Sequence, residues 1–97
     1  MIEGVFTDNG ISAPFYVPRG RILGLEIGGI WNAKLMFRRK MGITTANYPQ
    51  KGDAGWRDVQ GFVGNTVETY RSPGAWFDLK CSLHTGGTVI YKMGKGD

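Results

Sequence analysis

The stretch GAWFDLKCSLHTGGTVIYKMG, residues 74–94, decides how the rest of the chain is interpreted. Its first half has a period of two, because apolar or small residues alternate with residues that are polar apart from one tryptophan. Successive side chains of a strand point to opposite faces of a sheet, so this period predicts a half-buried strand. HTGG, residues 84–87, has the composition of a turn, and a second strand is predicted over 88–93. The stretch therefore predicts a β-hairpin. The expected core row of its first strand is Ala75, Phe77, Leu79, Cys81 and Leu83.

The same stretch holds the only cysteine and the only histidine of the chain, Cys81 and His84. Being three positions apart on a regular strand, they point to opposite faces and do not converge on a metal ion. Zinc needs further cysteine or histidine ligands, which the chain lacks, and a nucleophilic cysteine needs a base within hydrogen-bond reach. We therefore interpret Cys81 as a core residue and His84 as a surface turn residue. We predict no catalytic residue, no metal ligand and no cofactor.

Short apolar and aromatic runs separated by single glycines fill most of the chain. Sixteen of the 97 residues are glycine, which is about twice the usual share of roughly 7%. This pattern predicts many short strands and no helix. We expect one all-β domain over residues 1–97, an antiparallel β-sandwich of about eight short strands and of jelly-roll type, with a small barrel as the other possibility. The expected strands cover 2–6, 11–17, 21–27, 30–39, 56–62, 66–70, 75–83 and 88–93.

Glycine-containing dipeptides mark the predicted strand ends. Asn9–Gly10 is typical of a tight hairpin turn, and Gly28–Gly29 is expected to end one strand before the next begins. The run AKLMFRRK, residues 33–40, consists largely of good helix formers, but its apolar residues keep a period of two, which favours a strand. The polar segment from Gly42 to Gly55 is the longest predicted loop, and a loop of that length is often functional.

The aromatic residues divide into a core set and two tryptophans with an open assignment. Trp56 borders the long loop, and Trp76 lies on the polar face of its strand. Exposed tryptophans often mark binding surfaces, but these two can equally cover the second face or the open end of the sandwich. The residues predicted to lie in the core are Trp31, Leu35, Phe37, Phe77, Leu79 and Cys81.

Charged residues point to no specific chemistry. The net charge of +4 suits an acidic protein surface or weak contact with nucleic acid or a membrane, and it is also an ordinary solubilising charge. FRRK, residues 37–40, pairs basic residues with an aromatic ring, as single-strand binders do, but four residues do not make a groove. Asp53 and Asp58 flank Trp56, and two carboxylates near an aromatic ring are also found in glycosidases. Nothing sets their separation, so we favour exposed charge. We expect neither a membrane span nor a secretory signal.

The order of several motifs resembles a family of small all-β proteins encoded by tailed phages. That family has G-x-W-x-a-x-L-x-R in the middle of the chain, and w-x-R-L-r-c followed by s-G-T-v-x-Y-r-l near its end. The likeness extends from Ser12 to Met93, but Asp78 stands where the family has a basic residue, and the loop from Met41 to Gly55 is longer. The matching motifs are SAPFYVPRG (12–20), GGIWNAKLMFRR (28–39), a loop ending in GW (55–56), GNTVETYRSPG (64–74), WFDLKC (76–81) and GGTVIYKMG (86–94).

The resemblance implies a non-enzymatic virion protein that decorates the capsid exterior after synthesis in the host cytoplasm. Such a decoration, or cement, protein binds the outside of the icosahedral head and stabilises contacts between major capsid protein subunits. We expect a homodimer or homotrimer, with no small-molecule substrate and with neither nucleic acid nor a membrane as partner. The alternative is a carbohydrate-binding or tail/fibre-associated module, in which the rings of Trp56, Tyr70 and Trp76 stack on sugars. Partner contacts are expected from the N-terminal segment, from the loop 42–57, and from Arg38, Arg39, Lys40, Tyr48, Trp56, Arg57 and Trp76.

Overall fold

In the computed structural model, which describes residues 2–41 and 55–96, the chain forms seven strands and no helix. All strand pairs are antiparallel and belong to one sheet. The predicted all-β, antiparallel fold is therefore confirmed. No helix that could cross a membrane occurs in the described ranges. The strands are β1 (Ile2–Phe6), β2 (Gly10–Ile11), β3 (Phe15–Val17), β4 (Ile22–Met41), β5 (Arg57–Phe62), β6 (Thr66–Arg71) and β7 (Ala75–Gly96).

Two long strands form the centre of the sheet. β4 and β7 pair along their whole lengths, from Ile22 opposite Gly96 to Met41 opposite Ala75. β1, β2 and β3 follow one another along the other edge of β7. β5 and β6 follow one another along the other edge of β4. The sheet is therefore a ribbon four strands wide. Its two central positions are the continuous strands β4 and β7, and each of its two edges is made of shorter strands that follow one another.

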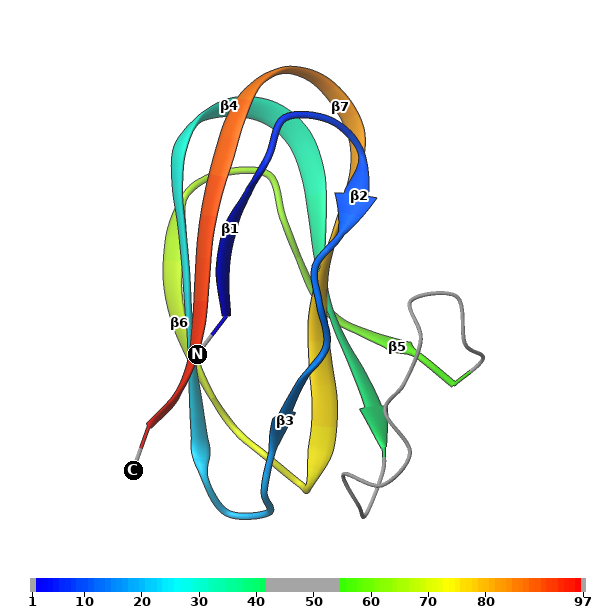
Figure 1. The fold of residues 1–97 in the computed structure, drawn as a ribbon, viewed down its shortest axis with the longest axis vertical. Coiled ribbons are helices and arrows are strands. Elements are labelled where there is room, and N and C mark those ends of the chain that lie inside the picture. The colour runs from blue at the N-terminus through cyan, green and yellow to red at the C-terminus, as the bar shows by residue number, and fades with distance from the viewer. Residues whose placement is uncertain (1, 42–54, 97) are drawn as a thin grey trace.

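The central strands are too long for the molecule unless they bend. A straight strand of 20 residues such as β4 would extend about 66 Å, whereas the longest dimension of the molecule is 37 Å. Figure 1 shows that β4 and β7 arch together over one end and return, so the ribbon is folded back on itself. We call the half that contains β1, β6 and residues 22–27 of β4 the first arm. The second arm contains β2, β3, β5 and residues 33–41 of β4.

Glycine residues permit the bend between the two arms. Gly29 in β4 and Gly87 in β7 have φ angles of +96° and +82°, which residues with a Cβ rarely adopt. A Cβ on Gly29 would collide with the carbonyl oxygen of Thr88, and one on Gly87 would collide with that of Ile30. Because the two backbones approach this closely at the bend, only glycine fits at either position.

The bend corrects three predictions made from turn-like sequences. Gly28–Gly29 and HTGG (84–87) do not end strands but lie inside β4 and β7. Asn9–Gly10 does not form a hairpin either, because β1 and β2 both pair with β7. Leu83 has a φ of +53° beside a break in the β4–β7 register, an irregularity of the β-bulge type. Leu83 consequently leaves the predicted core row and is 72% exposed.

The number and arrangement of the strands also differ from the prediction. We expected about eight short strands in a jelly-roll sandwich, and the described residues form seven strands in one sheet that is folded double. The two layers are thus the two arms of a single ribbon. The physical reason is that β4 and β7 each continue through a glycine-containing segment that the sequence pattern presents as a break.

The hydrophobic core lies between the arms. Phe37 of the second arm stacks on Tyr70 of the first arm, with ring centroids 4.7 Å apart, and on its neighbour Phe77 at 5.3 Å. Fully burying a large apolar side chain stabilises a fold by about 1.5–3 kcal/mol, so these rings hold the arms together. Five residues predicted for the core are at most 2% exposed, and Trp31 is partly buried against them. The five are Leu35, Phe37, Phe77, Leu79 and Cys81.

Candidate binding surfaces

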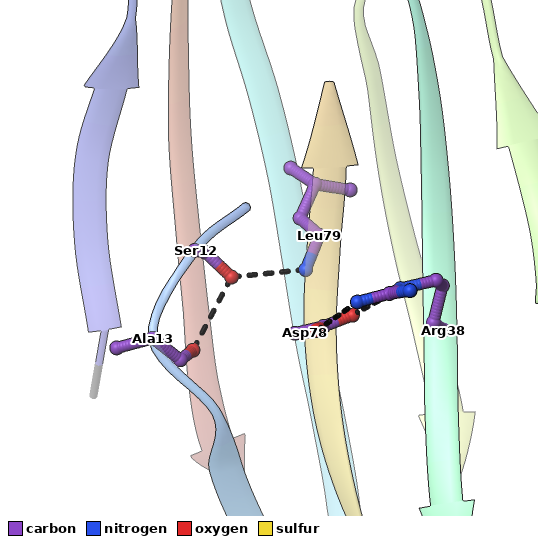
Figure 2. A network of polar contacts seen from close by, with 5 residues as sticks. All are labelled: Ser12, Ala13, Arg38, Asp78 and Leu79. Atoms are coloured by element: carbon purple, nitrogen blue, oxygen red, sulfur yellow. Dashed lines mark hydrogen bonds and ion pairs between the residues drawn. The ribbon is translucent and has the colours of Figure 1, made fainter. Parts of the chain in front are cut away.

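A buried ion pair joins the central strands on the outer face of the second arm. Arg38 of β4 lies opposite Asp78 of β7. Its Nε donates a hydrogen bond to Asp78 Oδ1 at 2.8 Å, and its Nη2 donates one to Oδ2 at 2.6 Å. Figure 2 shows the two side chains meeting between neighbouring strands. Their side chains are 11% and 1% exposed, so the pair neutralises two charges that the fold takes out of water.

Ser12 forms hydrogen bonds with the other edge of β7, next to this ion pair. Its Oγ accepts a hydrogen bond from the Leu79 N–H at 2.9 Å and donates one to the Ala13 carbonyl at 3.2 Å. Its own N–H donates to the Leu79 carbonyl at 2.9 Å. As Figure 2 shows, the segment between β2 and β3 is thereby tied to β7 next to Asp78. The carboxylate is thus held in a strand with hydrogen bonds on both of its edges.

Two residues predicted to face a partner are instead buried. Arg38 is only 9% exposed because its carboxylate partner lies in the same chain, and the ring of Trp56 lies 5.0 Å from its guanidinium carbon. Trp76 is 5% exposed, and Tyr16 of β3 packs against it edge-to-face at 5.4 Å. Both side chains therefore offer little surface to a partner in the single chain. Of the two assignments left open for Trp76, the buried one fits its position.

Two arginines lie directly opposite one another at the end of the second arm. Arg39 of β4 is directly opposite Arg57 of β5. Arg57 is exposed, and Arg39 is half-buried with its Nε buried and without a hydrogen-bond partner. We call these two residues the arginine pair. The next residue in β4, Lys40, is half-buried, so three predicted interface residues lie at the same end of the arm.

The Cys81–His84 pair does not form a reactive site. Burial, and to a smaller extent the charge of Asp8, raises the pKa of the Cys81 thiol, which keeps it protonated and poorly nucleophilic. The Nε2 of His84 lies 2.9 Å from the Gly87 carbonyl oxygen, and the backbone N–H of His84 donates a hydrogen bond to Asn9 Oδ1 at 2.9 Å. Within the described residues, no group of three or more potential metal ligands is found.

The rings proposed to stack on sugars are occupied by other contacts. Tyr70 stacks on Phe37, and its hydroxyl donates to Gln60 Oε1 at 2.6 Å. Trp76 is buried, and Trp56 lies beside Arg38. A flat exposed platform of these three rings is therefore not present. Tyr48, Asp53 and most of the predicted 42–57 loop lie outside the described residues.

An apolar groove, which the sequence analysis did not single out, occupies the outer face of the first arm. It encloses about 680 Å³. The side chains that line it include Val5, Val67 and Ile90, which are 57%, 72% and 53% exposed. The period of two does place these residues opposite the core face, but a single exposed valine or isoleucine is common. They become one surface only once β1, β7, β4 and β6 lie side by side.

No family model, no curated protein and no solved structure matches the chain.

Proposed function

We propose that this chain is a non-enzymatic phage capsid decoration protein that binds an acidic surface of the major capsid protein through the arginine pair. The proposal joins the motif resemblance to one observation, which is the juxtaposition of Arg39 and Arg57. In this reading the protein stabilises contacts between capsid subunits and has no catalytic centre.

The arginine pair supports the proposal because it is unfavourable in the isolated chain. Like charges directly opposite one another in a sheet are destabilising. A buried donor without a partner, such as Arg39 Nε, costs about 1–3 kcal/mol. A carboxylate supplied by a partner would remove both penalties, because arginine binds carboxylates through two parallel hydrogen bonds. The geometry therefore favours an acidic partner at this end of the second arm.

The doubled sheet suits a protein that resists mechanical load. The β4–β7 ladder continues through both arms and stiffens each of them, and separating the arms would expose the core that packs between them. A decoration protein acts in many copies, so each needs to add only a modest binding free energy across a subunit boundary. Rigidity limits the conformational entropy lost on binding.

The alternating faces of β4 argue against a nucleic-acid groove at FRRK. Arg38 and Arg39 point to opposite sides of the strand, and the Arg38 charge is neutralised by Asp78. A groove for a nucleic-acid backbone needs several cations along one face. The described part of FRRK therefore does not support that function.

The proposal is tested by cosedimenting the purified protein with phage heads prepared without it. We expect saturable binding that weakens as salt is raised, and we expect Arg57→Glu to weaken it at least tenfold. Lys34→Glu is the matched control, because Lys34 is also exposed and the substitution changes the net charge equally. Equal losses for the two variants would reject the arginine pair as the contact. Absence of binding by the wild-type protein, together with unchanged heat and chelator resistance of heads that lack it, would reject the function.

A further inference from the structure

The floor of the apolar groove is bare backbone. Gly28 of β4, the residue that follows the first arm, lines the groove, and a Cβ added there would meet no atom within 4 Å. Val5 and Ile90 lie beside it in neighbouring strands, since Val5 is opposite Ile90 and Ile90 is opposite Gly28. Val67 of β6 lies on the other side of β4, opposite Glu26. The groove is therefore a space left by a missing side chain, with apolar residues on both sides of it and charged residues along one part of its wall.

A row of three charged residues lines the same groove. Lys92 of β7 lies between Glu3 of β1 and Glu26 of β4, directly opposite each of them. All three side chains are exposed, and none takes part in an ion pair or a hydrogen bond with another described residue. The face therefore offers one positive and two negative groups next to an apolar patch.

We propose that this face binds a second copy of the same chain, as a two-fold symmetric dimer. In such a dimer both partners present the same patch, so the patch must complement itself. Lys92 satisfies this requirement because it can meet Glu3 or Glu26 of the partner, while the apolar walls of each copy close the groove of the other. An acidic capsid surface fits this face less well, because it would meet two carboxylates here.

The size of the face sets the expected strength of the dimer. The face spans the four strands β1, β7, β4 and β6, which at a spacing of about 4.8 Å give it a width of roughly 19 Å. About six residues along each strand, at about 3.3 Å per residue, give it a length of roughly 20 Å. A standard stable interface covers about 800 Å² on each partner, which is about twice this footprint. We therefore expect a weak dimer that forms as the protein concentration rises.

Sedimentation velocity of the purified protein over a concentration series tests the inference. The wild-type protein should shift from monomer to dimer as its concentration rises. Ile90→Lys and Gly28→Leu should keep it monomeric, the first by placing a charge in the apolar patch and the second by filling the groove. Val59→Lys is the control, because Val59 is 39% exposed but lies in β5 of the second arm. Circular dichroism establishes that each variant is folded.

A charge exchange identifies the self-complementary contact. Lys92→Glu should weaken the dimer at least fivefold, and adding Glu3→Lys or Glu26→Lys to it should restore association in at least one of the two double variants. A wild-type protein that stays monomeric throughout, an Ile90→Lys variant that dimerises normally, or failure of both double variants would overturn the inference. The result is separable from the proposed capsid binding, because it uses the protein alone and residues distant from the arginine pair.

Discussion

Replacing Gly87 by alanine tests whether close backbone approach at the bend holds the two arms in place. A non-glycine residue at the φ of +82° costs about 1–2 kcal/mol. The added Cβ would also lie 2.6 Å from Trp31 Cα, where ordinary contact begins at 3.4 Å. Moving β4 away to relieve such overpacking costs about 1–3 kcal/mol. We therefore expect Gly87→Ala to lower the free energy of unfolding by about 2–5 kcal/mol, out of the roughly 5–15 kcal/mol that is usual for a domain.

Gly86→Ala is the matched control for this substitution. Gly86 is the preceding residue in the same strand, its φ is not positive, and a Cβ there would meet nothing within 4 Å. We expect its unfolding free energy to stay within about 1 kcal/mol of the wild-type value. Urea denaturation followed by circular dichroism measures both variants, and a matching fall in Tm of at least about 8 °C is expected for Gly87→Ala. Equal stability of the two variants would refute the reasoning.

Three further predictions concern buried polar groups. Asp78→Ala should lower the unfolding free energy by about 3–5 kcal/mol because it leaves the Arg38 guanidinium buried and unpaired. Denaturant titration should find that the apolar double variant Arg38→Met/Asp78→Leu loses less stability. A larger loss in the double variant than in Asp78→Ala would contradict the account. Burial, followed by the charge of Glu68, raises the pKa of Tyr70 to about 12, so the stability from its neutral phenol is complete below about pH 10 and is lost as the pH rises toward 12. Ultraviolet titration should show one tyrosine that ionises near pH 12, and this step should disappear in Tyr70→Phe. Ionisation of Tyr70 near its ordinary pKa would contradict the prediction. The Cys81 thiol, buried and with a raised pKa, should react with a thiol reagent only as fast as the protein unfolds, whereas rapid labelling of the folded protein would show that it is accessible.

Local periodicity predicted most of the residues that face the core, with Leu83 as an exception, but not how far each strand runs. The alternation around Leu35 and Phe37, and around Phe77 and Leu79, reflects the two faces of a strand, and each of these residues lies in the core. The compositions of Gly28–Gly29 and HTGG are compatible both with a turn that ends a strand and with a bend inside a continuous strand. The difference depends on which strand lies opposite, and β4 and β7 are paired only in the folded chain.

The candidate site was harder to predict because its residues depend on strand register. Arg38 and Asp78 each lie on a polar face in the sequence pattern, and only the register places them opposite one another. Their pairing removes Arg38 from the candidate surface. The same register places Arg39 opposite Arg57 and so sets two like charges side by side. Neither arrangement has a signal within a single segment of the sequence.

The position and copy number of the protein in intact phage particles test the central claim most directly. Electron cryomicroscopy of purified particles should show many copies placed regularly on the outside of the head, with Arg39 of β4 and Arg57 of β5 against an acidic surface of the major capsid protein. Heads from a deletion mutant should lack this density. A few copies at a single vertex would instead indicate a tail component, and absence from the particle would contradict the proposed function.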